Sequence, residues 1–241
     1  MKILAIDTSS KICSVSILED NKLIIEKHNN DEKTHSQKLM PLIDITFKEA
    51  NLCLDDIDLL ACCQGPGSFT GIRIGISTVK AFADVKNIPI IGVTSLESLA
   101  YNIKENALIA TIIDAKNNNV YFALYNYNSN TKTYSSICEP RADNIDNIIE
   151  IINSNIGNVK QNYSNNKLIL VGDGAIVNKE LLKNKILNCN FASDSSNIQT
   201  SISVGLSAFD KYNSNSYVPC YTVSPIYLKK SQAERTLSGE K

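Results

Sequence analysis

The chain has 241 residues, 43% of them hydrophobic, with 24 basic and 25 acidic side chains. This length and apolar content suit one large domain or two small lobes, and a formal charge of -1 disfavours a protein that holds nucleic acid alone. Seven cysteines without a Cys-x-x-Cys pair indicate neither a disulfide framework nor a zinc site. With no long apolar run and no signal-peptide pattern, we expect a reduced cytoplasmic protein that does not contact a membrane.

The first hundred residues predict alternating strands and helices. We expect three strands first, then a helix that starts late or kinks because Pro41 lies near its beginning. A buried strand, a glycine-rich turn, a second helix and another strand follow. In chain order the expected elements are strands 3–7, 12–18 and 23–26, helix 39–50, strand 57–63, helix 70–85 and strand 88–93.

A similar plan begins again near residue 108. The strand there ends in Asp114, as the first strand ends in Asp7, and Asp143 is a suitable N-cap for a later helix. Two β-β-β openings suggest a duplicated lobe. The expected elements are strands 108–114, 120–125 and 132–137, helix 143–152, a polar loop at 153–166, strand 167–171 and helix 203–212. We assign residues 1–104 to an N-terminal lobe, 105–230 to a C-terminal lobe and 231–241 to a mobile tail.

Two short segments have both a functional and a structural interpretation. Asp7, Thr8 and Ser9 close a strand and could form a phosphate loop in which Asp7 holds magnesium through water, but these residue types also favour ordinary turns. The four residues 7–10 alone favour the turn, and Asp114 at the matching place of the second lobe adds weight to the functional interpretation. Gly172 and Gly174, around Asp173, form a second phosphate-loop candidate, although the motif alone favours a plain turn.

The glycine-rich stretch 65–75 is the most informative part of the chain. It could cradle an anion at a helix N-terminus, or form a tight turn in which Ser68 or Thr70 caps the helix. Gly71 and Gly75 are four apart and lower helix propensity, which close approach of another helix would compensate. That other helix is either the helix 39–50 of the same chain or part of another subunit.

The sequence contains few histidines that could bind a metal or act in catalysis. His28 and His35 are the only two, and neither has metal-ligand spacing with a cysteine or another histidine. We expect His28 at a strand end and His35 at a helix start or on the surface. Without a placed base, Ser9 and Ser68 are not credible nucleophiles.

Several of these segments resemble the bacterial TsaB (YeaZ) family. The resemblance is specific over roughly the first hundred residues and weaker afterwards, where the family usually has arginine in place of Lys116 and Lys229. The segments that carry it are 3–9, 34–43, 65–75 and 89–97, followed by 114–116, 120–121 and 225–229.

The resemblance implies the α/β fold shared by actin, sugar kinases and heat-shock ATPases, with two lobes of duplicated β-β-β-α-β-α units. It also implies a role in forming N6-threonylcarbamoyladenosine at position 37 of tRNAs that read codons beginning with A. In that pathway the metalloenzyme TsaD transfers the threonylcarbamoyl group, TsaB is its non-catalytic partner, and the ATPase TsaE joins them. tRNA would then be met through the complex.

TsaD-type proteins carry two metal-binding histidines on the helix that follows their Gly-Val strand. In the same frame this chain has Ser95 and Leu99. Leucine cannot ligate a metal, and serine alone is a poor ligand, so metal-assisted acyl transfer is not expected here. No intrinsic cofactor is expected, although ATP with magnesium at the level of the complex stays open.

Our leading hypothesis is a scaffold or activator that docks TsaD through the helices 39–50 and 70–85. The same surface would form a homodimer when TsaD is absent. The expected docking residues are Leu39, Leu42, Ile43, Phe47, Gly67, Thr70, Gly71, Ile72, Gly75 and Val79. Two alternatives remain: a stand-alone ATP-binding enzyme, motivated by Asp7, Thr8, Gly172 and Gly174, and a metalloprotease, which the absent histidine pair makes the weakest.

Overall fold

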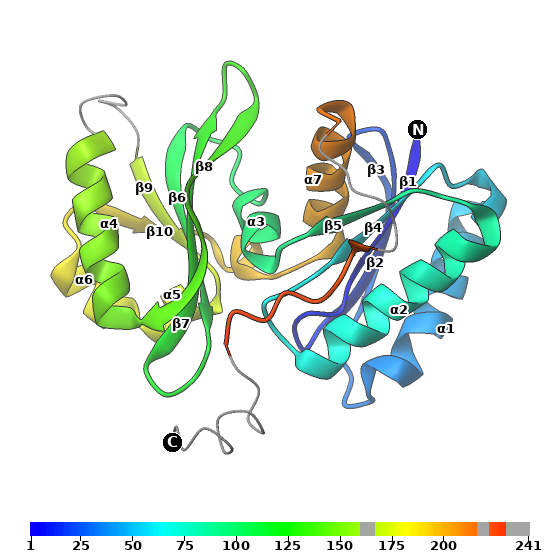
Figure 1. The fold of residues 1–241 in the computed structure, drawn as a ribbon, viewed down its shortest axis with the longest axis horizontal. Helices are drawn as coiled ribbons and strands as arrows, with labels where there is room; N and C mark the ends of the chain where they lie inside the picture. Colours follow the sequence, from blue (N-terminus) through cyan, green and yellow to red (C-terminus); the bar gives the residue numbers. More distant parts are fainter. Residues whose placement is uncertain (160–166, 216–221, 230–241) are drawn as a thin grey trace.

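Two five-stranded sheets with helices on their faces form the molecule (Figure 1), and the computed structural model describes residues 1–159, 167–215 and 222–229. The first sheet contains β1 (Lys2–Asp7), β2 (Cys13–Glu19), β3 (Lys22–Asn29), β4 (Leu59–Cys63) and β5 (Ile90–Val93). The second contains β6 (Ala107–Asp114), β7 (Asn119–Asn128), β8 (Thr133–Asn144), β9 (Lys167–Val171) and β10 (Cys189–Phe191). The α-helices are α1 (His35–Ala50), α2 (Phe69–Lys86), α3 (Ser95–Ala100), α4 (Ile145–Val159), α5 (Asp173–Val177), α6 (Lys179–Lys185) and α7 (Ser201–Asn213).

The two sheets share one topology. Their strand orders are β3-β2-β1-β4-β5 and β8-β7-β6-β9-β10. In each, the first strand of the lobe is central, pairs antiparallel with the hairpin on one side and pairs parallel with the later strand on the other. This equivalence confirms the duplication predicted from the two β-β-β openings. The carboxyl ends of β1 and β6, marked by Asp7 and Asp114, are therefore equivalent positions.

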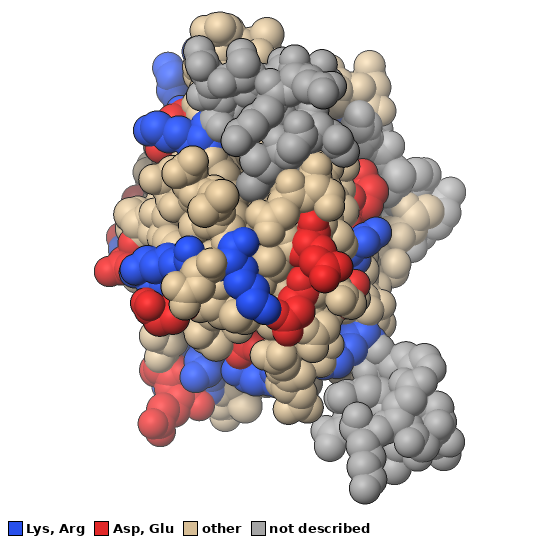
Figure 2. All heavy atoms as spheres, turned by 90° about the vertical axis from the view of Figure 1, so that its left-hand side faces the viewer, with Lys and Arg blue, Asp and Glu red and all other residues tan. Residues whose placement is uncertain are grey.

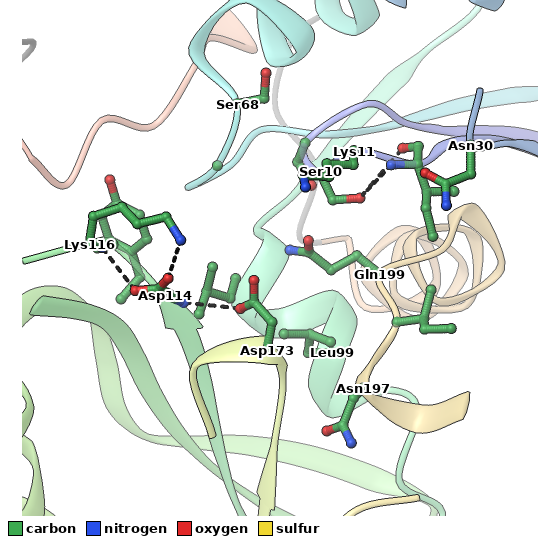
Figure 3. A pocket seen from close by; sticks show the side chains of 17 residues that line it. Ser10, Lys11, Asn30, Ser68, Leu99, Asp114, Lys116, Asp173, Asn197 and Gln199 are labelled. Carbon is green, nitrogen blue, oxygen red and sulfur yellow. Dashed lines mark hydrogen bonds and ion pairs between the residues drawn. The ribbon is translucent and has the colours of Figure 1, made fainter. Parts of the chain in front are cut away.

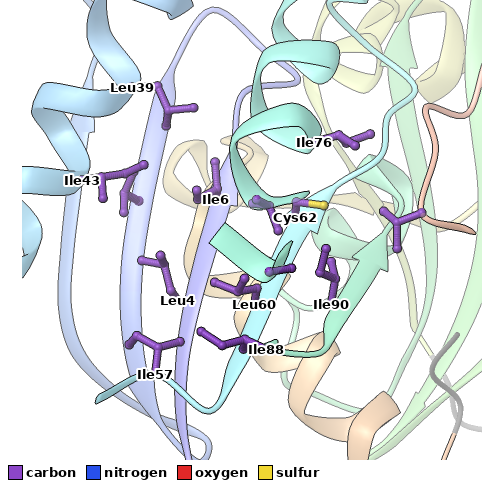
Figure 4. Packing of buried hydrophobic residues seen from close by; sticks show 14 of the residues in the cluster. Leu4, Ile6, Leu39, Ile43, Ile57, Leu60, Cys62, Ile76, Ile88 and Ile90 are labelled. Carbon is purple, nitrogen blue, oxygen red and sulfur yellow. The ribbon is translucent and has the colours of Figure 1, made fainter. Parts of the chain in front are cut away.

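Helices cover both faces of the first sheet. α1 and α2 pack on one face, where side chains such as Leu4 and Ile6 of β1 meet Leu39 and Ile76 (Figure 4). α7 packs on the opposite face, over Ile3 and other members of a second cluster. A strand buried on both faces needs a continuous apolar run, which explains why β1 lacks the polar alternation of a half-exposed strand.

α1 begins earlier than the sequence predicts. It starts at His35, and Thr34 caps it: the backbone N–H of Thr34 donates to the Gln37 side chain at 3.2 Å, as in a capping box. Pro41 lies inside the helix, so the expected start near Leu39 is wrong. The cap and the burial of Lys38 and Leu39 stabilise the helical turn before Pro41, and this outweighs the tendency of proline to start a helix later.

The helix after β8 also differs from the prediction. α4 begins at Ile145, two residues after the expected N-cap Asp143, and the Asn144 side chain accepts a hydrogen bond from the Asp146 N–H at 2.9 Å. The helix continues to Val159, so the first half of the expected polar loop is helical. Residues 160–166 lie outside the described residues, as do 231–241, the expected mobile tail.

α7 lies in the sequence range that we assigned to the C-terminal lobe, yet it packs on β1, β2, β4 and β5 of the first sheet. Conversely, α3 comes from the N-terminal range and packs on β6 and β7. The reason is that α1 and α2 cover only one apolar face of the first sheet, and the other face needs a helix from later in the chain. No helix within the described residues is long and apolar enough to cross a bilayer.

Candidate functional site

A cleft of about 610 Å³ lies between the two lobes, beside the carboxyl ends of the two central strands (Figure 3). The first lobe contributes the β1–β2 turn and the loop before α2, and the second contributes the β6–β7 turn and the start of α5. Asn197, Ile198 and Gln199 come from the segment before α7. The full lining is Ser9, Ser10, Lys11, Ile12, Asn30, Gly67, Ser68, Leu99, Ile113, Asp114, Ala115, Lys116, Tyr121, Asp173, Asn197, Ile198 and Gln199.

The residues of the first phosphate-loop candidate are bonded to one another and to α2. The Oδ1 of Asp7 accepts from the N–H of Ser9 at 2.8 Å and from its Oγ at 2.7 Å. Thr8 is buried, and its Oγ1 donates to the Gly71 carbonyl at 2.7 Å. Of the three, only Ser9 lines the cleft. These contacts are those of a structural turn, in which Thr8 ties the end of β1 to the first turn of α2.

Asp7 is 1% exposed, and its Oδ2 has no hydrogen-bond partner among the described residues. Burial raises the pKa of this carboxyl, against the lowering effect of the hydrogen bonds from Ser9. A carboxyl that is costly to ionise and does not reach the cleft is poorly suited to hold a hydrated cation. Nearby, the Nε2 of His35 contacts the Ser10 carbonyl at 2.9 Å, and burial lowers the pKa of its ring. His35 lies at a helix start and His28 in β3, as predicted.

The loop before α2 also packs against the turn between β1 and β2. The Ser68 N–H donates to the Ser9 carbonyl at 2.7 Å, and the Ser68 Oγ accepts from the Gly71 N–H at 3.2 Å. Ser68 is therefore the N-cap of α2, which supports the capped-turn interpretation of the glycine-rich stretch. A Cβ on Gly67 would lie 2.2 Å from the Ser9 carbonyl oxygen, so the close approach of the two turns needs glycine there.

Gly172 and Gly174 are also packing residues. Gly172 has a φ of 111°, and a Cβ there would lie 2.3 Å from the carbonyl oxygen of Ile112. A Cβ on Gly174 would lie 2.8 Å from the Asp114 nitrogen. The glycines let the start of α5 lie directly against the end of β6, where the Asp114 N–H donates to Asp173 at 3.0 Å.

On the second-lobe side of the cleft, Asp114 pairs with Lys116 through both a backbone hydrogen bond of 2.9 Å and an ion pair. Burial alone would raise the pKa of Asp114, but these bonds and the charge of Lys116 hold it below its usual value. Lys116, Asn117 and Asn118 all have positive φ values, between 54° and 61°. The equivalent turns of the two lobes thus differ. Asp7 is buried, whereas Asp114 lines the cleft and is paired with the Lys116 side chain.

Ser95 and Leu99 are both completely buried. The Ser95 Oγ lies 3.1 Å from the Sγ of Cys63, and Leu99 belongs to the apolar cluster under the second sheet and forms part of the cleft floor. No group of three or more metal-binding side chains gathers anywhere in the described segments.

The expected docking residues separate into buried and accessible ones. Phe47 is partly buried, and Gly67 and Thr70 are accessible. The residues that lie in the chain's own interior are Leu39, Leu42, Ile43, Gly71, Ile72, Gly75 and Val79. A groove of about 520 Å³ does run between α1 and α2. Of the predicted residues, Leu39 and Thr70 line it, and only Thr70 is accessible there; side chains next to the predicted ones form the rest of its surface. Its lining is Ser36, Leu39, Met40, Phe69, Thr70, Arg73, Ile74, Ser77 and Thr78.

The role assigned to Gly71 and Gly75 needs correction. A Cβ on Gly71 would lie 2.1 Å from the Thr8 carbonyl oxygen, and one on Gly75 would lie 2.5 Å from the Thr8 Oγ1. The glycines therefore make room for the end of β1 and, at Gly71, also for the His35 ring at the start of α1 in the same chain, rather than for a helix of another subunit. Sequence periodicity identified the small face of α2 but not what covers it.

The helix periodicity missed an aromatic cluster beside this groove. Tyr227 stacks on Phe69 with ring centroids 4.6 Å apart, and its hydroxyl accepts from the Arg73 Nε at 2.7 Å. The Arg73 guanidinium lies 4.1 Å from the Phe69 ring centre. Both rings remain more than 40% exposed. The only signal for Tyr227 in the sequence was the family resemblance of residues 225–229.

Charged side chains are interspersed on the face of the second lobe that Figure 2 shows. Two ion pairs of that lobe illustrate this: Lys167 lies 2.9 Å from Glu105, and Lys185 lies 2.7 Å from Asp146. A face with neighbouring charges of both signs lacks the basic stripe that phosphate backbones require.

A family model described as "TsaD: tRNA N6-adenosine threonylcarbamoyltransferase" matches residues 24–237. Proteins named "tRNA threonylcarbamoyladenosine biosynthesis protein TsaB" are similar to the chain. The one from Bacillus subtilis is 38% identical over 53% of this chain and 56% of its own length. The one from Buchnera aphidicola is 34% identical over 71% and 78%. The chain spans little more than half the length of several such relatives, including that from Escherichia coli at 57%.

Two solved structures from Pseudomonas aeruginosa share the fold. One, an uncharacterized protein with similarity to peptidase YeaZ, has a TM-score of 0.75 at 22% identity and covers 95% of this chain and 99% of its own. The other, YeaZ, has a TM-score of 0.72 at 21% identity and covers 94% and 99%. Together with the duplicated sheet topology, these matches confirm the predicted two-lobed actin-like ATPase fold.

Proposed function

Because the chain belongs to the TsaB (YeaZ) family, we propose that it takes part in tRNA threonylcarbamoyladenosine biosynthesis as a non-catalytic partner of a TsaD-type transferase. One observation carries the non-catalytic role: Ser95 and Leu99 occupy the positions that the resemblance assigns to the metal-binding histidines, and both are packed into the interior. Leucine offers no donor atom to a metal, so the acyl donor cannot be polarised there.

The partner surface that we propose is the groove between α1 and α2, with Met40, Phe69 and Arg73 as its accessible anchors. Exposed aromatic, methionine and arginine side chains around an apolar groove have the composition of protein interfaces. Tyr227 extends this surface through its stack on Phe69. The same surface would pair two copies of the chain when TsaD is absent, so the two assemblies should compete.

In this proposal TsaE joins the complex, and tRNA is bound mainly by the partners, as the near-neutral charge of the chain suggests. The contacts of Asp7, Thr8, Gly172 and Gly174 do not favour the alternative of a stand-alone ATP-binding enzyme. Calorimetry with magnesium and ATP on the isolated chain tests that alternative directly, since heat at a saturable stoichiometry would revive it.

The decisive experiment measures tRNA modification by purified TsaD with and without this chain, with the threonylcarbamoyl-AMP synthase, TsaE and tRNA present. We expect modification to depend on the chain, and modification at an equal rate without it would refute the proposal.

Binding to TsaD is measured with a matched pair on one helix, Met40→Asp in the groove and Ile45→Asp outside it, since both side chains are exposed. We expect only Met40→Asp to weaken binding. Equal effects of the two changes would remove the groove from the proposal.

A further inference from the structure

The two lobes meet along a row of polar side chains between α3 and α7. α3 packs on the second sheet and α7 on the first, so a bond between these helices is a bond between the lobes. Figure 1 shows both helices between the sheets. We call this row the α3–α7 seam; it consists of Glu97, Tyr101 and Asn102 from α3 and its end, and of Ser203, Ser207, Asp210 and Lys211 from α7.

A single carboxylate of α3 is held by α7 through both of its oxygens. The Ser207 Oγ donates to the Oε1 of Glu97 at 2.6 Å, and the Lys211 Nζ donates to its Oε2 at 2.6 Å. The Lys211 Nζ also donates to the carbonyl of Gly92 in β5 at 3.3 Å. The Glu97 and Lys211 side chains are only 17% and 28% exposed, so solvent screens this pair less than an ion pair on the open surface.

A second group of bonds lies one turn further along α3. The Tyr101 hydroxyl donates to the Oδ2 of Asp210 at 2.9 Å, and Ser203 donates to Asn102. The Tyr101 ring stacks on Tyr134 of β8 with centroids 3.9 Å apart, and Tyr134 contacts Tyr127 of β7 at 4.4 Å. Tyr101 therefore connects a carboxylate of the first lobe to an aromatic stack on the second sheet.

The spacing of these residues fixes the register of the two helices. On α7 the bonding positions Ser203, Ser207 and the adjacent pair Asp210 and Lys211 share one face, while Val204 and Ala208, on the neighbouring side of the helix, are buried against the first sheet. Asn102 adds two bonds to backbone carbonyls that precede α7, those of Ser196 at 2.8 Å and Ile198 at 3.0 Å. A rotation of one lobe on the other would slide α3 along α7 and break several of these bonds together.

We propose that the α3–α7 seam locks the two lobes at one angle, so that the cleft between them neither opens nor closes in the isolated chain. This inference is independent of the proposed partner. A partner that touches both lobes would then meet a preorganised surface and would not lose the entropy of ordering two mobile lobes.

Backbone residual dipolar couplings test the proposal on the full chain. In the unmodified protein, one alignment tensor should fit the amides of both sheets. Two different tensors in the unmodified protein would overturn the proposal, whatever any variant does.

Variants then test whether the seam is the lock. In Glu97→Ala with Tyr101→Phe, each lobe should retain its own spectrum while the two lobes show unequal alignment. Lys211→Met is the milder variant if the first does not fold. Asp44→Asn, which removes the exposed ion pair of Asp44 with Lys48, is the matched control and should leave one tensor. A folded seam variant that keeps one shared tensor would also overturn the proposal.

Discussion

Adding a single methyl group to Gly71 or Gly75 distinguishes packing within the chain from docking of a partner. Both glycines lie on the side of α2 that faces the end of β1. At Gly71 the obstacle is a backbone atom, because a Cβ would lie 2.1 Å from the Thr8 carbonyl oxygen. At Gly75 the obstacle is a side-chain atom, because a Cβ would lie 2.5 Å from the Thr8 Oγ1. A substitution at Thr8 can remove the second obstacle but not the first.

The expected magnitudes follow from three terms. Overpacking a well-packed interior costs about 1–3 kcal/mol. Replacing a helical glycine by alanine stabilises the helix by about 1 kcal/mol. Gly71→Ala also disturbs the hydrogen bond from Thr8 to the Gly71 carbonyl, worth about 1 kcal/mol. The free energy of unfolding should therefore fall by about 1–3 kcal/mol in Gly71→Ala from all three terms. In Gly75→Ala it should fall by about 0–2 kcal/mol from the first two terms.

Urea denaturation followed by circular dichroism measures these changes. In a Thr8→Ala background, Gly75→Ala should stabilise by up to about 1 kcal/mol relative to Thr8→Ala alone, whereas Gly71→Ala should remain destabilising. Ser77→Ala on the exposed side of α2 is the control and should change stability by less than about 0.5 kcal/mol. The reasoning fails if Gly71→Ala is as stable as the unmodified chain, or if Thr8→Ala does not relieve Gly75→Ala.

Three further predictions concern other parts of the molecule. Because burial raises the pKa of Asp7, the folded chain binds this proton more tightly than the unfolded chain, so the free energy of unfolding falls as pH rises through the raised pKa. Asp7→Asn should flatten that slope in urea midpoints measured across acidic and neutral pH, and an unchanged slope would contradict the assignment. Tyr227→Ala should weaken TsaD binding by about 2 kcal/mol in calorimetry, with Tyr227→Phe intermediate; unchanged affinity in Tyr227→Ala would exclude the ring from the docking surface. Lys132 has a φ of 56° at an exposed turn, so Lys132→Gly should raise the free energy of unfolding in urea denaturation by up to about 1 kcal/mol; a lower free energy of unfolding would show that the turn carries no such strain.

The amino-acid sequence was enough to predict the class of fold and to show which residues stand where the resemblance expects metal-binding histidines. The strand openings that end in Asp7 and Asp114 predicted the duplication, because alternation and turn residues are local signals. Ser95 and Leu99 excluded a histidine pair without any coordinates, since the identity of a side chain decides whether it can ligate a metal. Ser68 was likewise one of two caps that the sequence predicted for α2, the other being Thr70.

What covers each apolar or small-residue face could be learned from the three-dimensional packing alone. Helical periodicity shows that one face of α2 is buried but contains no information about the segment that buries it, and for Gly71 and Gly75 that segment is the turn at Thr8. The same limitation hid Tyr227, which contacts Phe69 and Arg73 although it lies 154 positions after Arg73 in the chain. It also hid the seam of α3 and α7, because contacts between residues a hundred positions apart depend on how whole lobes pack, which no local pattern records.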